Sequence, residues 1–137
     1  MAGYLAITAI ISMALMTGCA GNAGNRPGPG GTGQVRPVAL TPAQLQAIQG
    51  GVRQMIADPG SARFSAARAV AIAGRPGVHV CGHVRQKDSG GSYGPDLPYY
   101  LELRDKDGKP TPERGQVGSD DAKRAKITFM CRHRSEG

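Results

Sequence analysis

The feature that most constrains the fold is a strictly alternating stretch at residues 78–84. Successive side chains of a strand point to opposite faces of a sheet, so this stretch separates an apolar row from a polar row. The apolar row is Val78, Val80 and Val84, and the opposite row is His79, Cys81 and His83. Residues 69–73 form another apolar run, and the Gly-Arg-Pro-Gly segment between the two runs is typical of a turn. The pattern predicts two neighbouring strands.

A helix is predicted before these strands, from Pro42 to about Ala57. Thr41 and Gln44 have the spacing of a capping box, and proline is favoured at the first helical position. Apolar residues then recur at helical spacing, namely Leu45, Ile48 and Val52. Gly50 and Gly51 lie inside this helix and cost about 1 kcal/mol each relative to alanine, so close packing against a sheet would account for them.

Further elements are predicted towards the C-terminus. Residues 99–104 alternate as a third strand, and the Ser-Asp-Asp sequence at 119–121 is typical of a helix start. Residues 127–131 leave two alternatives open, a strand or one longer C-terminal helix. The predicted fold class is α+β: a single small domain, residues 41–137, in which an N-terminal amphipathic helix packs on a short, mainly antiparallel sheet.

The first 40 residues are predicted to lie outside this domain. Residues 4–16 are almost wholly apolar but fall short of the roughly 20 residues that a membrane-spanning helix needs, so they are interpreted as the apolar core of a signal peptide. Residues 20–36 are rich in glycine and proline and show no periodicity, which is typical of a flexible tether. Cys19 stands between these two segments.

The segment Leu15-Met16-Thr17-Gly18-Cys19 resembles the bacterial lipoprotein signal, in which small residues precede an acylated cysteine. The resemblance implies that residues 1–18 are a cleaved signal peptide, that Cys19 carries the lipid, and that residues 19–40 form a lipidated flexible tether. Two or more acyl chains give essentially permanent attachment, because each buried methylene contributes about 0.8 kcal/mol. Ala20 stands where many enteric lipoproteins of the inner membrane have Asp, so the expected location is the outer membrane, facing the periplasm.

Four motifs of the chain resemble those of a group of small, uncharacterised proteobacterial envelope proteins. They are Asp58-Pro59-Gly60-Ser61-Ala62-Arg63-Phe64, Val80-Cys81-Gly82-His83-Val84, Gly90-Gly91-Ser92-Tyr93 and Cys131. The resemblance covers roughly residues 58–131. It implies an envelope protein and carries no activity or catalytic residue over to this chain.

The charge of the chain indicates acidic partners. With 17 Lys and Arg against 10 Asp and Glu, the formal net charge is +7. In a bacterial envelope, a basic surface meets anionic lipid head groups, lipopolysaccharide phosphates, acidic glycans or another envelope protein. Nucleic acid is not an expected partner, because the aromatic residues are too scattered to form a base-stacking platform. General solubility is the alternative explanation of the charge.

The predicted role is non-enzymatic binding or structural support, with no catalytic residue, cofactor or metal site. The alternative is a small metal-binding protein using Cys81, His83, Cys131 and His133, or a hydrolase using Ser92. Ser92 lies in a Gly-x-Ser-x-Gly sequence at residues 90–94. A nucleophile elbow must open a helix directly after a strand, and Pro95 and Pro98 argue against a helix at this place.

A disulfide between Cys81 and Cys131 is predicted from the cysteine count. The chain has 3 cysteines, and acylation of Cys19 leaves one pair. An exported protein meets an oxidising compartment, in which such a pair forms a disulfide. The bond would tie the last predicted element to the second strand.

Overall fold

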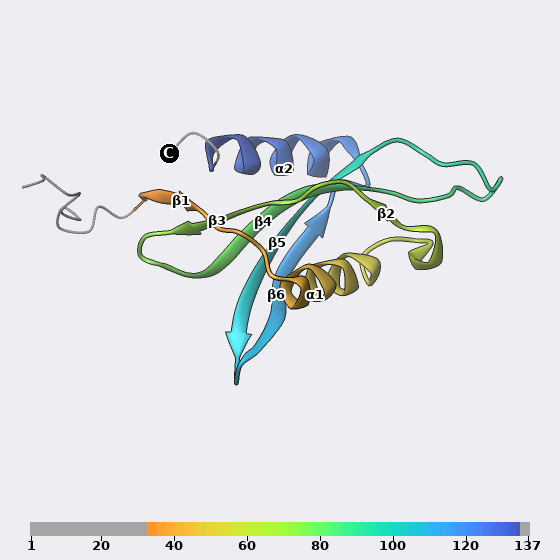
Figure 1. The fold of residues 1–137 in the computed structure, drawn as a ribbon. Helices are drawn as coiled ribbons and strands as arrows, with labels where there is room; N and C mark the ends of the chain where they lie inside the picture. Colours follow the sequence, from red (N-terminus) through yellow and green to blue (C-terminus); the bar gives the residue numbers. More distant parts are fainter. Residues whose placement is uncertain (1–32, 135–137) are drawn as a thin grey trace, which may run out of the picture.

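The computed structural model describes residues 33–134 (Figure 1). The predicted signal peptide, the lipidation site Cys19 and most of the predicted tether lie outside the described residues. The elements in chain order are β1 (Val35–Pro37), α1 (Pro42–Arg53), the 3₁₀ turn η1 (Pro59–Ser61), β2 (Arg63–Phe64), β3 (Arg68–Ile72), β4 (Arg75–Arg85), β5 (Leu97–Lys106), β6 (Lys109–Val117) and α2 (Asp121–His133).

The strands form one six-stranded sheet in which every pairing between named strands is antiparallel. The order across the sheet is β1-β3-β4-β5-β6, and β2 pairs with β4 outside this path. Phe64 of β2 pairs with Val84, and Arg68 of β3 pairs with Cys81, so β2 and β3 follow one another along the same edge of β4. The two helices lie on opposite faces of the sheet (Figure 1).

The face that α1 covers carries the hydrophobic core. Val80 of β4 lies opposite Leu101 of β5, and both are buried together with Ile48 and Val52 of α1. The alternation predicted for residues 78–84 places the valines on this face, because paired residues of neighbouring strands share a face. Burial of apolar side chains from two layers is therefore what holds α1 on the sheet.

Two glycines allow close approaches within this core. A Cβ on Gly82 would lie 2.5 Å from the hydroxyl oxygen of Tyr99, whose ring fills the space above that position. A Cβ on Gly51 of α1 would lie 3.0 Å from side-chain carbons of both Leu101 and Pro112. The close packing suggested for the helical glycines therefore holds at Gly51, whereas a Cβ on Gly50 would meet nothing within 4 Å.

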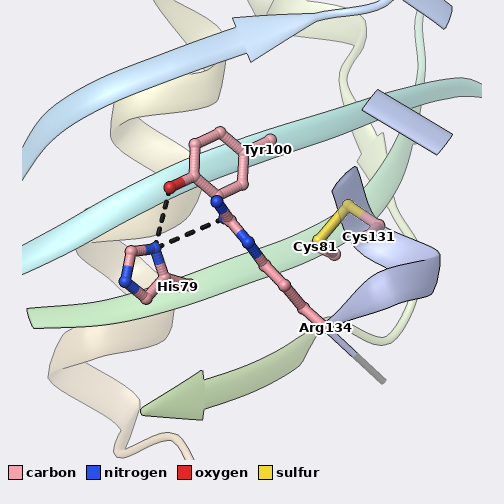
Figure 2. The surroundings of a disulfide bond; sticks show 5 residues. All are labelled: His79, Cys81, Tyr100, Cys131 and Arg134. Atoms are coloured by element: carbon pink, nitrogen blue, oxygen red, sulfur yellow. Dashed lines mark hydrogen bonds between the residues drawn. A yellow bond between two sulfur atoms is a disulfide. The ribbon is translucent and has the colours of Figure 1, made fainter. Parts of the chain in front are cut away.

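The opposite face of the sheet carries α2 and the polar row of β4. Ile127 is the buried residue of α2. Cys131 of α2 forms a disulfide with Cys81 of β4, with the two Cα atoms 6.0 Å apart, which confirms the predicted bond. A covalent link therefore joins α2 to the centre of the sheet (Figure 2).

The predicted fold class is wrong. An N-terminal amphipathic helix on a short sheet was expected, whereas residues 33–134 are mostly a six-stranded antiparallel sheet with one short early helix and a second helix at the C-terminal end. The error has a physical cause in β6, which contains Pro110 and Pro112. Proline is depleted in strands, but it is tolerated on an edge strand, where one row of backbone groups has no strand partner.

The hairpin that contains β6 is closed by a two-residue turn. Lys106 of β5 pairs with Lys109 of β6, and the two residues between them, Asp107 and Gly108, have φ values of 56° and 76°. Positive φ at both central residues is what a type I′ turn requires, and Asp-Gly is one of its favoured sequences.

The ambiguous segment 127–131 is helical and belongs to α2. Asp120 caps this helix, because its side chain accepts a hydrogen bond of 2.9 Å from the backbone N–H of Lys123. At the other end of the domain, β1 lies within the last residues of the predicted tether and pairs with β3, so the sheet begins at Val35. Among residues 33–134, no helix has the length and apolar character needed to cross a membrane.

Candidate anion-binding pocket

One hollow on the α2 face of the sheet gathers four arginine side chains. Its volume is about 350 Å³, and its lining includes Arg75, Arg104, Arg114, Arg134, His79, Tyr100 and Glu102. We call this hollow the arginine pocket. Its side chains come from β4, β5, β6 and the C-terminal end of α2.

The register of the sheet brings these residues together. His79 of β4 pairs with Glu102 of β5, and Glu102 pairs in turn with Arg114 of β6. These three residues therefore form a row across the sheet on the face opposite the valine and leucine core. Arg134 is the C-cap residue of α2, so the helix adds its guanidinium to the same row from above.

His79 forms the buried part of the arginine pocket, with 4% of its surface exposed. Its Nδ1 lies 2.8 Å from the hydroxyl oxygen of Tyr100 and 3.4 Å from Nη1 of Arg134 (Figure 2). A guanidinium can only donate hydrogen bonds, so these contacts assign the acceptor role to Nδ1 and the hydrogen to Nε2. Nε2 points away from both partners in Figure 2, and it is buried with no hydrogen-bond partner among residues 33–134.

The imidazole of His79 is held in its neutral form. Burial is the largest cause that lowers its pKa, and the positive charge of Arg134 lowers it further. Glu102 opposes the shift, because a nearby carboxylate favours the imidazolium. The neutral ring therefore offers one N–H donor at Nε2 and one acceptor at Nδ1.

The four arginines differ in how they are neutralised. Nη2 of Arg104 donates to Oε1 of Glu102 at 2.9 Å, and its Nε lies 2.8 Å from Oε2 of Glu113. Arg134 instead lies over the ring of Tyr100, with 4.6 Å between its guanidinium carbon and the ring centroid. Within the described chain, the side chains of Arg75 and Arg114 form no hydrogen bond or ion pair. Glu113 lies outside the lining and is shared between Arg104 and Lys106. The lining residues, four arginines and Glu102, carry a formal surplus of three positive charges.

This arrangement is suited to binding an oxyanion. The planar guanidinium presents paired N–H donors that match the oxygens of carboxylate and phosphate groups, and it stays charged at any physiological pH. The lining contains no serine, threonine or cysteine, and its carboxylate, Glu102, already accepts from Arg104. The pocket therefore offers several guanidinium donors for recognition of an oxyanion.

The four residues of the metal-binding alternative do not form a ligand cluster. The sulfur atoms of Cys81 and Cys131 are bonded to each other. His133 packs its ring against Phe129 on α2, with 4.3 Å between the ring centroids, and His83 lines a separate groove of about 490 Å³ beside the disulfide. Within residues 33–134, no group of three or more His, Cys, Asp and Glu residues is placed to hold a metal ion.

Ser92 lies in the connection between β4 and β5. Its backbone N–H donates to Oδ1 of Asp88 at 3.0 Å, and its carbonyl oxygen accepts from the backbone N–H of Asp88. Lys87 and Tyr93 form an isolated bridge that closes this turn. A strand precedes and a strand follows the segment, so the strand-to-helix geometry of a nucleophile elbow is not formed here.

The sequence interpretation did not find the arginine pocket. Its arginines are far apart in the chain, at positions 75, 104, 114 and 134, and they meet only through the strand register and the docking of α2. The available signals were the net charge of +7 and the position of His79 on the polar face of a predicted strand. Neither signal identifies which arginines converge.

Comparison of the chain with protein-family models, with curated proteins and with solved structures finds no match.

Proposed function

We propose that this chain is a non-enzymatic binding protein of the bacterial cell envelope. It is held by lipid at Cys19, at the outer membrane and facing the periplasm, and it binds anionic envelope components through the arginine pocket. The observation that carries the proposal is the surplus of three positive charges around one hollow of about 350 Å³. Guanidinium groups gathered in this way repel one another, and an anion relieves the repulsion.

The disulfide supports an exported protein. Structural disulfides form and persist in oxidising compartments such as the bacterial periplasm and are rare in the cytosol. The bond between Cys81 and Cys131 fits this location, and it leaves Cys19 as the remaining cysteine of the chain. Lipidation of Cys19 is tested by metabolic labelling with a fatty-acid analogue, which should mark the wild type and fail to mark Cys19→Ser.

Anion binding is tested with the full chain in phosphatidylcholine nanodiscs, using isothermal titration calorimetry with phosphate, sulfate and acetate. We expect the double variant Arg75→Ala/Arg114→Ala to lose about tenfold or more in affinity, because hydrogen bonds to charged groups contribute about 1.5–3 kcal/mol each. The matched control is Arg36→Ala/Lys126→Ala, which removes the same charge from exposed positions of β1 and α2. Absence of binding, or equal loss in both double variants, would contradict the proposal.

A further inference from the structure

We propose that the arginine pocket takes a phosphomonoester, a phosphate group with a single organic substituent, bound through the guanidinium groups of Arg75, Arg114 and Arg134. The inference rests on the proposed anion-binding function and narrows it to one ligand class. It is carried by the charge surplus and by the dimensions of the hollow.

The charge surplus matches a phosphomonoester better than it matches singly charged anions. Arg75, Arg114 and Arg134 have no carboxylate partner among the described residues, whereas Arg104 is already paired with Glu102 and Glu113. A carboxylate or a sulfate monoester brings a single negative charge. A phosphomonoester carries about −1.5 to −2 at neutral pH and three terminal oxygens, so it engages several guanidinium forks at once.

The dimensions of the hollow indicate a phosphate with a small attached group. Its volume of about 350 Å³ lies at the small end of the range for ligand pockets, which is about 300–1,000 Å³. Arg75 and Arg114 are exposed, so the hollow opens to solvent on their side and leaves room for the organic substituent to extend outwards. Terminal phosphates of this kind occur on phosphorylated glycans and on lipid head groups, and the chemistry of recognition is shared.

Ligand class is tested by calorimetry of the full chain in phosphatidylcholine nanodiscs with glycerol 3-phosphate, methyl sulfate and acetate. We expect glycerol 3-phosphate to bind about tenfold or more tightly than the two singly charged anions, since it makes at least one additional charge-assisted hydrogen bond. Equal affinity for all three would overturn the phosphomonoester inference and leave the proposed anion binding intact. Binding of none would overturn both.

Calorimetric titrations in nanodiscs that contain an anionic lipid distinguish the source of the phosphate. Phosphatidic acid in the nanodisc presents a lipid-borne phosphomonoester, and phosphatidylglycerol presents a phosphodiester with a single charge. If phosphatidic acid alone competes with glycerol 3-phosphate, a lipid head group reaches the pocket and supports the inference. If neither lipid competes, the source is a soluble or glycan-borne phosphate, which supports the same ligand class. Equal competition by both lipids would contradict it.

Discussion

The two faces of the sheet hold their helices by different means. Under α1, Val80 and Leu101 are buried together with Ile48 and Val52, and the contact is apolar on both sides. Under α2, Ile127 is the buried residue of the helix, and the sheet presents His79, Glu102 and Tyr100 beside the disulfide. One helix is held by burial of hydrophobic area, and the other by a covalent bond supplemented by few apolar contacts.

This difference shows how a small domain can keep a polar pocket on its sheet. A helix held only by apolar burial needs an apolar sheet face beneath it, which excludes charged groups from that face. The bond between Cys81 and Cys131 fixes α2 without that requirement, so the residues around it are free to be charged. The arginine pocket lies on the face that the disulfide secures.

The largest effect is expected from loss of the disulfide. Cys81→Ser should lower the free energy of unfolding by about 4 kcal/mol, because in the chain-entropy model the bond closes a loop across a separation of 50 residues. Chemical denaturation of the non-reduced protein measures the change. Cys131→Ser and the double variant should lose the same amount, since all three lack the same bond. A double variant that loses the sum of the single effects would contradict this reasoning.

A cavity in the hydrophobic core under α1 should lower the free energy of unfolding. Leu101→Ala truncates a side chain of β5 that is 1% exposed beneath α1, and it should cost about 3 kcal/mol in the free energy of unfolding. Thr128→Ala on the exposed side of α2 is the control, with an expected change within about 0.5 kcal/mol. If the two substitutions had similar effects on the denaturation midpoint, the apolar face would not be the main source of stability.

A smaller change in stability is expected from substitution of two neighbouring glycines of α1. Gly50→Ala should stabilise the protein by about 1 kcal/mol, because alanine is the better helix former and the new Cβ meets nothing within 4 Å. Gly51→Ala should fail to give this gain, because its Cβ would lie 3.0 Å from Leu101 and Pro112. Thermal unfolding of both variants provides the measurement. Equal stabilisation would show that α1 can move away from the sheet freely.

The smallest expected effect is a pH dependence of stability caused by His79 on the polar face of the sheet. The pKa of His79 is lowered by burial and by Arg134, so the unfolded chain takes up a proton at this residue at a higher pH than the folded chain. The contribution of the neutral His79 ring to the free energy of unfolding is therefore fully present above about pH 6.5, the ordinary histidine pKa. This contribution is lost as the pH falls through the lower pKa of the folded state. Hydrogen bonds from Lys106 and Lys123 lower the pKa values of Glu113 and Asp120 below their ordinary 4.5 and 3.8.

Urea unfolding at about pH 7 and about pH 5 tests this dependence. The wild type should lose stability between the two conditions, and His79→Gln should lose less. His83 and His133 are exposed and remain in both proteins, which makes the variant a matched control. An identical loss in the wild type and the variant would assign the dependence to other groups.

Local patterns in the sequence predicted the parts of the fold that depend on local chemistry. The capping box at Thr41 and Gln44 forms as expected, the alternation at residues 78–84 is part of β4, and the cysteine count predicted the disulfide. The prediction failed at β6, because its two prolines contradict strand propensity and its position at the edge of the sheet is a property of the whole fold. The arginine pocket was missed for the same reason, since strand register decides which arginines meet.

The prolines of β6 also affect how copies of the protein meet one another. An exposed edge strand is a template on which a strand of a second molecule can extend the sheet, and this is a route to aggregation. Neither Pro110 nor Pro112 can donate a backbone hydrogen bond to an approaching strand. A ladder built on this edge would therefore lack two of its bonds, so β6 closes the sheet against growth and favours separate domains at high local concentration.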